Sequence, residues 1–243
     1  GFEREVPSFD DVLADDEEGT VVILTRHNLH PDQIVRAFAA GKNVFVEKPL
    51  ALNEAELRAV ERAVAESNGS LFVGYNRRYA PLVQEVERFV SGTSEPGVFT
   101  YRVNGGFIPA DHWTQSPELG GGRIVGEACH FVDLLMCLSG ETPVAVSAAQ
   151  AADGGKYSGD NVVASIEFDG GSIGSICYTA SGDRAGGKER LEVFRGGRFA
   201  EVDDFRVARL VSGGKVKVHK SRLRQDKGHV RQWHAIREAL LHG

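Results

Sequence analysis

Apolar residues in the first third of the chain fall into two alternating patterns. In one pattern, short runs are mostly apolar and β-branched or aromatic, which predicts strands buried on both faces of a sheet. In the other, apolar residues recur every three or four positions behind a capping residue or a proline, which predicts amphipathic helices. The predicted strands are 20–24, 44–46 and 71–75, and the predicted helices are 8–17, capped by Ser8, 31–40, and one beginning after Asn53. This alternation is typical of a parallel, doubly wound α/β sheet.

The pattern changes after Pro81. A helix is predicted over 82–90 and a strand over 98–103, followed by a loop rich in glycine and proline over 104–122 and a helix over 125–138. Later β-type runs alternate with glycine and aspartate turns, which predicts an antiparallel sheet. These runs cover 144–151, 161–168, 172–180, 189–196, 198–204 and 206–212, and a last helix is predicted over 229–241. We therefore predict an α/β fold in two parts, 1–77 and 78–243.

Composition and charge exclude several classes of function. The 243 residues are 42% hydrophobic and 26% charged, which is ordinary for a globular protein with a buried core. A formal net charge of −6 gives no electrostatic basis for binding nucleic acid, and no apolar run is long enough to span a membrane. The three cysteines, Cys129, Cys137 and Cys177, lack CxxC spacing, which predicts reduced thiols, a cytoplasmic protein and no zinc site. No secretion leader is visible.

Polar residues follow each of the three predicted parallel strands, in the segments Thr25–His30, Glu47–Pro49 and Asn76–Tyr79. Ligands bind beyond the carboxyl ends of strands in an open parallel sheet, so these segments are expected at one rim. Lys48, beside Glu47 and partly desolvated, is suited to exchange a proton or a hydrogen bond with a substrate hydroxyl group. The alternative is an ordinary surface ion pair before a turn, which contributes little.

Three stretches carry a resemblance to a known family: NVFVEKPLAL at 43–52, TRHNLH at 25–30 and VGYNRRYAP at 73–81. They resemble the glucose–fructose oxidoreductase / inositol dehydrogenase (Gfo/Idh/MocA) family, whose members join a Rossmann domain to an α/β domain with an open, mostly antiparallel sheet. The resemblance implies that 1–77 is the C-terminal part of a Rossmann dinucleotide-binding domain and that 78–243 is an α+β domain for substrate binding and oligomerisation. It also implies NAD or NADP as cofactor.

By this resemblance, Lys48 is the catalytic or substrate-orienting lysine beside the nicotinamide. The residues implied to contact the cofactor are Thr25, His27, Asn28, His30, Glu47, Lys48, Pro49, Asn76, Arg77 and Trp113. The first stretch departs from the family twice: Arg26 stands where the family has proline, and His27 stands at its asparagine position. Trp113 is implied to shield the nicotinamide from water, and the alternative is a structural anchor of its loop.

A second matching stretch, GGGRIVGEACHFVDLL at 120–135, is a glycine-rich turn followed by a helix with the pattern HxxD. Glu127, His130 and Asp133 are spaced by three residues, so they share one helix face. The resemblance implies that His130 is the acid or base for the substrate hydroxyl group, a task suited to imidazole near pH 7; the alternative is a hydrogen-bonded core histidine. Asp133 either orients His130 or supports packing.

This stretch also departs from the family. Many members have an aspartate four residues before the histidine, and here that position is Gly126. Glu127 is the candidate replacement and is counted with Lys48 and His130 as catalytic, although one residue turns a helix by about 100°.

The stretches RVNGGFIPADHW, KERLEVFRGG and QDKGH add a narrower resemblance to the C-terminal half of bi-domain oxidoreductases associated with polysaccharide metabolism. Lys188, Arg190 and Lys227 in this region are interpreted as solvated surface charges rather than as contacts to an anionic sugar. The first residue is Gly1, and no GxGxxG turn, which a Rossmann domain uses to bind pyrophosphate, is present. We therefore expect an N-terminal truncation of roughly 60 residues, and weak or no cofactor binding by these 243 residues alone.

The leading hypothesis is an NAD(P)-dependent oxidoreductase that transfers a hydride between nicotinamide and a secondary hydroxyl group of a sugar, sugar acid or nucleotide-sugar. The alternative is a non-catalytic module of the same fold that senses a dinucleotide or a sugar; Lys48 and His130 favour the enzyme, and Gly126 favours the alternative. The expected partners are a small carbohydrate and a second copy of the chain, bound through the open face of the second-domain sheet. Neither nucleic acid, a membrane nor a metal is expected.

Overall fold

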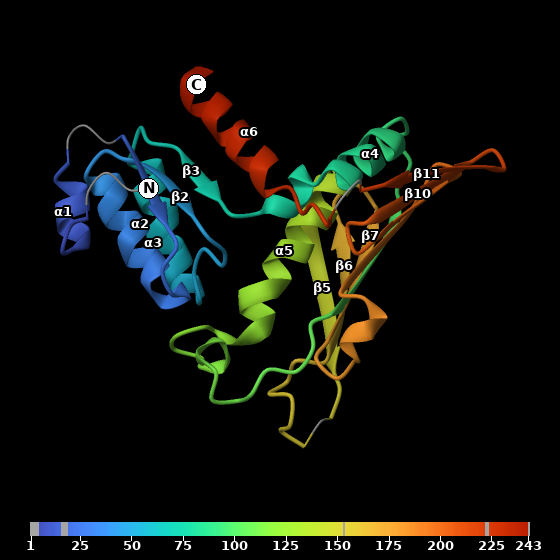
Figure 1. The fold of residues 1–243 in the computed structure, drawn as a ribbon, viewed down its shortest axis with the longest axis horizontal. Helices are drawn as coiled ribbons and strands as arrows, with labels where there is room; N and C mark the ends of the chain where they lie inside the picture. Colours follow the sequence, from blue (N-terminus) through green and yellow to red (C-terminus); the bar gives the residue numbers. More distant parts are fainter. Residues whose placement is uncertain (1–4, 16–18, 153, 222–223, 243) are drawn as a thin grey trace. The chain divides into compact units, whose positions relative to one another are not determined.

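The computed structural model describes residues 5–15, 19–152, 154–221 and 224–242, and Figure 1 follows the chain through them. The chain divides into two compact units. Unit 1 comprises 1–75, 113–127 and 239–243, and unit 2 comprises 76–112 and 128–238. The assignment of 1–77 as a dinucleotide-binding domain and of 78–243 as a substrate domain stays a prediction.

Unit 1 contains a three-stranded parallel sheet in the order β1-β2-β3. Its strands are β1 (Thr20–Ile23), β2 (Asn43–Val46) and β3 (Leu71–Val73), and its helices from the same part of the chain are α1 (Phe9–Leu13), α2 (His30–Ala39) and α3 (Glu54–Ala65). The strand–helix alternation predicted from the sequence is confirmed. The predicted helix over 8–17 is shorter, because α1 ends at Leu13; residues 16–18 lie outside the described ranges.

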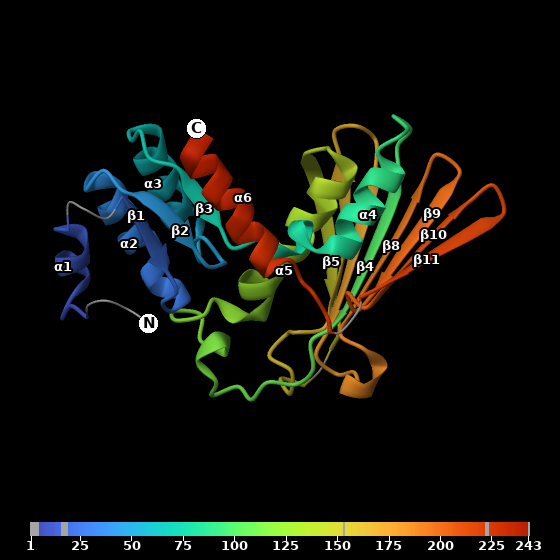
Figure 2. The same cartoon turned by 45° about the horizontal axis from the view of Figure 1, so that its top comes forward.

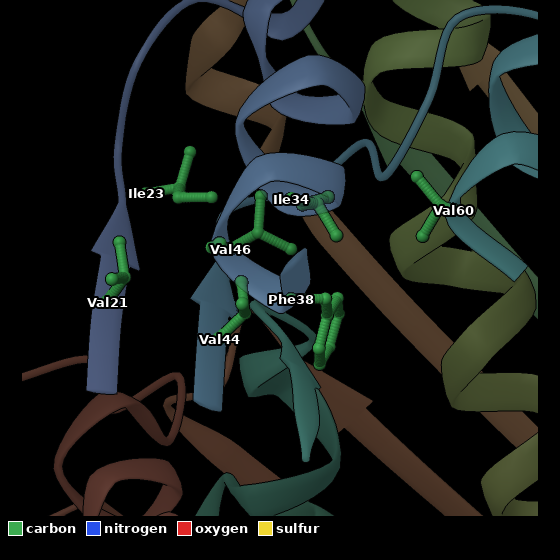
Figure 3. Packing of buried hydrophobic residues seen from close by; sticks show 8 residues of the cluster. Val21, Ile23, Ile34, Phe38, Val44, Val46 and Val60 are labelled. Atoms are coloured by element: carbon green, nitrogen blue, oxygen red, sulfur yellow. The ribbon is translucent and has the colours of Figure 1, made fainter. Parts of the chain in front are cut away.

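Two predicted caps hold these helices at their N-termini. The Ser8 hydroxyl accepts the Asp11 N–H, and the Asn53 side chain accepts the Glu56 N–H at 3.0 Å. Each such cap stabilises a helix by about 1 kcal/mol. Figure 3 shows the core beneath: Ile34 and Phe38 of α2 pack on Val44 and Val46 of β2. The periodic apolar residues of the helix and the apolar residues of the strands therefore pack in one core, as the sequence pattern predicts.

Unit 2 is built on an eight-stranded sheet in the order β11-β10-β9-β8-β4-β7-β6-β5. The strands are β4 (Val98–Asn104), β5 (Pro143–Gln150), β6 (Val162–Phe168), β7 (Ile173–Thr179), β8 (Glu189–Arg195), β9 (Arg198–Asp203), β10 (Val207–Ser212) and β11 (Lys215–Lys220). Every neighbouring pair is antiparallel except β4 and β7, which are parallel. The mostly antiparallel sheet is confirmed, whereas β11 was not predicted.

Helices cover one face of this sheet. They are α4 (Pro81–Val90) and α5 (Gly122–Ser139), and Figure 2 shows both on the same side of the strands. Phe131 of α5 meets Tyr101 of β4 edge-on, with ring centroids 5.0 Å apart. The helix predicted over 125–138 begins three residues earlier, at Gly122. The last helix, α6 (His229–His242), agrees with its prediction.

The opposite face of the sheet carries an apolar row. The strand register places one residue from each of six neighbouring strands side by side: Ile173, Val98, Phe194, Phe199, Val211 and Val216. Phe194 and Phe199 stack with ring centroids 4.9 Å apart, and Ile173 and Val216 are 50% and 54% exposed. At about 4.8 Å between strands, the row is about 24 Å long.

Candidate functional site

The carboxyl ends of β1 and β2 lie at one edge of the unit 1 sheet, because the two strands are parallel and in register. His30 joins the segments that follow them. Its side chain is fully buried, with Nδ1 2.8 Å from the Pro49 carbonyl oxygen and Nε2 3.1 Å from the Thr25 carbonyl oxygen. The Lys48–Pro49 peptide bond is cis. The polar segments that follow β1 and β2 therefore lie side by side, as expected, and the buried His30 side chain contacts both of them.

Lys48 extends from this edge toward the first turns of α5. Its Nζ donates a hydrogen bond to the Gly126 carbonyl oxygen at 2.8 Å, within unit 1. Glu47 turns to the other side, where its carboxylate lies against Gly74 at the end of β3. A Cβ at Gly74 would stand 2.8 Å from Glu47 Oε2, so this glycine leaves the space that the carboxylate occupies. The two charges that end β2 are thus directed to different neighbours and do not form a simple surface pair.

The segment 113–127 returns to the same edge and brings Trp113 and Gly120 with it. His27 Nδ1 lies 2.9 Å from the Gly120 carbonyl oxygen. The rings of His27 and Trp113 meet edge to face, with centroids 4.8 Å apart and planes inclined by 72°. The Arg26 guanidinium lies 5.9 Å from the centre of the Trp113 ring. We call His27, His30, Lys48 and Trp113 the strand-edge cluster.

Burial and nearby positive charge keep His27 neutral. Burial lowers the pKa of the imidazole below its ordinary value of 6.5, the hydrogen bond to Gly120 opposes this, and Lys48 and His30 lower the pKa further. A proton on this ring would be poorly solvated and would face the Lys48 ammonium group. His27 is therefore a neutral imidazole at pH 7.

The other predicted catalytic residues lie on α5. Glu127 accepts a hydrogen bond from Arg123, whose Nη2 is 3.2 Å from Oε1. His130 follows Gly126 by four residues, which is about one turn of the same helix, and is buried in unit 2. Asp133 forms a bidentate ion pair with Arg78, with one N–O distance of 3.0 Å. Of the two roles expected for Asp133, the contacts favour a packing role through Arg78.

Asn76 and Arg77 belong to unit 2 and are engaged there. Arg77 donates two hydrogen bonds, at 2.7 and 3.0 Å, to the buried Glu189 carboxylate. Asn76 donates to the Lys227 carbonyl oxygen at 2.8 Å. Thr25, in unit 1, donates its hydroxyl proton to Gln33 at 2.6 Å. Thr25, His27, Asn28, His30, Glu47, Lys48, Pro49, Glu127 and Trp113 therefore belong to unit 1, and Asn76, Arg77 and His130 belong to unit 2.

Two partners in this site were missed from the sequence, namely the carbonyl groups of Gly120 and Gly126. Backbone acceptors carry no residue-specific signal, so only the glycine-rich character of 120–126 was available as a clue. Within the described ranges, no group of three or more His, Cys, Asp or Glu side chains is arranged to hold a metal ion. In the same ranges, no helix is both long enough and apolar enough to cross a membrane.

Comparisons with known proteins identify both parts of the chain. Residues 1–75 match a family model described as an oxidoreductase family with an NAD-binding Rossmann fold, and 95–196 match the GFO/IDH/MocA C-terminal domain. Inositol 2-dehydrogenase of Rhizobium meliloti (strain 1021) is 33% identical over 185 residues, which are 74% of this chain and 53% of that protein. The chain spans about half the length of the curated relatives that it matches.

Solved structures show the same fold over nearly the whole chain. A putative myo-inositol dehydrogenase from Sinorhizobium meliloti 1021 aligns with a TM-score of 0.78 and 25% identity, covering 98% of this chain and 75% of that one. GenD2 from gentamicin A biosynthesis, solved in complex with NAD, aligns with a TM-score of 0.78 and 25% identity, covering 98% and 73%.

The strand-edge residues fit one end of a dinucleotide. Asn28 Oδ1 is buried and has no hydrogen-bond donor among the described residues, and the carboxamide N–H groups of a nicotinamide would satisfy it. The 243 residues contain no GxGxxG turn, which is the motif that binds the pyrophosphate of a dinucleotide in a Rossmann domain. The described residues therefore suit the nicotinamide end of the cofactor.

Proposed function

Because the chain belongs to the Gfo/Idh/MocA oxidoreductase family, we propose that the protein carrying it is an NAD(P)-dependent dehydrogenase. Its substrate is a secondary hydroxyl group of a sugar, sugar acid or nucleotide-sugar, with inositols included because the relatives named above act on them. The observation that carries this proposal is the position of Lys48. Its ammonium group is held at the first turns of α5, the helix that also bears Glu127 and His130.

Each proposed catalytic residue has a separate role. A bound nicotinamide would accept or donate the hydride. One N–H of the Lys48 ammonium group donates to the Gly126 carbonyl oxygen. The other two N–H groups can donate to the reacting oxygen. His130 hydrogen-bonds the substrate hydroxyl group and is a candidate acid or base for its proton. Glu127, held by Arg123, completes the set in place of a carboxylate at position 126.

The cofactor contacts are proposed for predicted site residues that belong to unit 1. Asn28 accepts from the carboxamide, because its oxygen is buried without a donor in the described chain. Trp113 excludes water from the nicotinamide. His30 holds the carbonyl groups of Thr25 and Pro49 in place at the same edge of the sheet. Glu47 lines the same edge of the sheet, whereas His27 Nδ1 donates to the Gly120 carbonyl oxygen and no contact of His27 with the cofactor is proposed. Arg77 and Asn76 are left out, since their polar groups are engaged in unit 2.

The test uses the complete reading frame that encodes this chain. Inositols, sugars, sugar acids and nucleotide-sugars are screened with NAD and NADP for absorbance of the reduced nicotinamide. Lys48→Met and His130→Asn are each expected to lower kcat/KM by about 100-fold or more. Lys220→Met, on the exposed edge strand β11, is the control and is expected to retain full activity. A Lys48→Met/His130→Asn double variant with normal activity would refute the mechanism.

A second function is favoured by Gly126, which places no side chain opposite Lys48. In this alternative the protein senses a dinucleotide or a sugar without turnover. Saturable binding of NADH or of a sugar, with no change in nicotinamide absorbance across the whole substrate panel, would support the sensor and exclude the dehydrogenase.

We also propose that two copies associate through the apolar row of the unit 2 sheet. Strands of about six residues across eight strands give a face of roughly 700 Å² per copy, close to the ~800 Å² of a standard interface. Phe194→Asp places a charge in the middle of the row and is expected to yield monomers in sedimentation velocity. Val230→Asp, on the exposed surface of α6, is the control. Unchanged assembly of Phe194→Asp would exclude this face.

A further inference from the structure

His27 occupies space that is open only because residue 126 has no side chain. Gly126 is buried on α5. A Cβ placed on it would lie 3.2 Å from His27 Cε1, 3.5 Å from the Gly120 carbonyl oxygen and 3.6 Å from His27 Nδ1. The imidazole therefore lies against the side of Gly126 where a Cβ would be, and the carbonyl oxygen of the same residue accepts a hydrogen bond from Lys48 Nζ.

The hydrogen bond to Gly120 determines which ring nitrogen of His27 carries the proton. A carbonyl oxygen only accepts, so the contact of 2.9 Å requires a hydrogen on Nδ1. In the neutral ring the lone pair is then on Nε2. Nε2 makes no hydrogen bond to any residue within the described ranges. The tautomer is fixed, and its basic nitrogen remains available.

The groups that face His27 favour a base at neutral pH. Lys48, from the segment after β2, and His30, on the same segment as His27, are the titratable neighbours, and the Arg26 guanidinium lies 5.9 Å from the centre of the Trp113 ring. Burial and the Lys48 charge lower the pKa of the ring. A base with a pKa somewhat below the working pH is deprotonated and still able to take a proton in a transition state.

We propose that His27 Nε2, rather than His130, accepts the proton of the substrate hydroxyl group beside Lys48, and that Gly126 makes the room for the His27 ring. This rests on the proposed dehydrogenase function. In oxidation, the substrate O–H bond breaks, its electron pair stays on the oxygen, and the proton forms a new bond to Nε2. The Lys48 ammonium group offsets the charge that develops on the oxygen. In reduction, the same proton returns to the oxygen.

The structural alternative is that His27 only anchors the loop through Gly120. His27→Asn separates the two roles, because the asparagine amide can donate to the Gly120 carbonyl oxygen from the position of Nδ1 but is not a base. We expect kcat/KM to fall by about 100-fold or more, with NADH affinity, from the fluorescence of the dihydronicotinamide, within about threefold of the wild type. The acidic limb of the kcat/KM profile, with its midpoint below 6.5, should disappear.

A second readout needs no substrate. The chain has two tryptophans, Trp113 and Trp233, so a Trp233→Phe variant emits only from Trp113. An imidazolium quenches an adjacent indole more strongly than neutral imidazole does, and the two rings are 4.8 Å apart. As the pH is lowered, Trp113 emission should decrease with a single midpoint below pH 6.5. The His27→Asn substitution should abolish this transition.

The outcomes separate this inference from the proposed function. An active wild type whose His27→Asn variant retains kcat/KM within about threefold, or retains the acidic limb, overturns the role of His27 and leaves the dehydrogenase intact. A wild type that neither binds NADH nor turns over any alcohol overturns both. A large loss of kcat/KM together with loss of the acidic limb, at unchanged NADH affinity, supports the inference.

Discussion

Two groups of charged and polar side chains, one in each unit, use their hydrogen-bonding capacity in opposite ways. In unit 2, Glu189 accepts from Arg77, from Lys227 and from the Tyr101 hydroxyl, so both its oxygens are occupied. We call these four residues the Glu189 cluster. In the strand-edge cluster of unit 1, counting only the part of the chain that the structure describes, Lys48 makes one hydrogen bond from its ammonium group and His27 one from its ring.

Burial explains why the Glu189 cluster is complete. The Glu189 side chain is fully inaccessible to solvent and Arg77 is nearly so, and a buried charge without partners is very unfavourable. Although burial alone would raise it, the pKa of the Glu189 carboxyl falls to about 2 because Arg77 and Lys227 stabilise the ionised form. Two cations face one carboxylate, so loss of the carboxylate leaves both unpaired.

The comparison shows how a structural network differs from a candidate site. The Glu189 cluster joins η2 (Asn76–Tyr79), β4, β8 and the segment before α6, and both Glu189 carboxylate oxygens are occupied. The strand-edge cluster has an ammonium group and a neutral imidazole that retain hydrogen-bonding capacity beside a buried, unsatisfied Asn28 oxygen. Unused capacity of this kind is what a ligand can satisfy. Removing a residue should therefore cost stability in the first cluster and activity in the second.

The largest expected effect on stability is that of Glu189→Gln. The substitution keeps the shape but leaves the buried Arg77 and the partly buried Lys227 without a counter-charge, so the free energy of unfolding should fall by about 3–5 kcal/mol. Urea unfolding measures it. Glu192→Gln, on the same strand but at a partly exposed ion pair, is the matched control and should cost less than about 1 kcal/mol. Equal costs for the two variants would contradict the comparison.

The same carboxylate predicts a dependence of stability on acid. The Glu189 pKa is lowered from its ordinary value of 4.5 to about 2 by folding, so its contribution is fully present above pH 4.5 and is lost as the pH falls toward 2. Urea midpoints measured between these values should fall more steeply for the wild type than for Glu189→Gln. Parallel curves would mean that Glu189 is not the group whose pKa folding lowers.

The sequence predicts the elements of the strand-edge cluster better than its contacts. Caps, apolar runs and a lysine after a buried strand are local signals, so Asn53, β2 and Lys48 were all recognised. His27 and Trp113 are far apart along the chain, and the partners that position His27 and Lys48 are carbonyl groups of glycines. A contact between a side chain and a distant backbone carbonyl group cannot be predicted from residue type or from position in the chain.

The same limit applies to unit 2. Lys227 was interpreted as a solvated surface charge, yet its ammonium group pairs with the buried Glu189 carboxylate. The strand β11 contains three lysines and two valines in six residues, and five of the six are exposed, so it lacks the apolar density of the other strands. Its lysines stand on a sheet edge, where charge discourages pairing with other chains. Edge strands and paired charges are defined by neighbours that the local pattern does not contain.

Gly126→Ala should separate stability from activity in a single variant. Alanine favours a helix over glycine by up to about 1 kcal/mol, so unfolding should become no easier. The new Cβ, however, would be 3.2 Å from His27 Cε1 and displaces the ring by a few tenths of an ångström. We expect kcat/KM to fall by about tenfold. In a His27→Asn background the same change should have no further effect on kcat/KM, and a full tenfold loss there would show that the two positions are not coupled.

The smallest expected effect is that of Lys48 on the protonation of His27. Lys48→Met removes a charge that lowers the His27 pKa while keeping a side chain of similar length. The midpoint of the Trp113 emission titration should therefore rise, because the charge that opposes protonation of the imidazole is gone. High salt should reduce the difference between the two proteins, because the site is only partly buried. A midpoint that stays fixed or falls would show that the Lys48 ammonium group does not act on the imidazole, and the strand-edge cluster would then be two separate residues rather than one site.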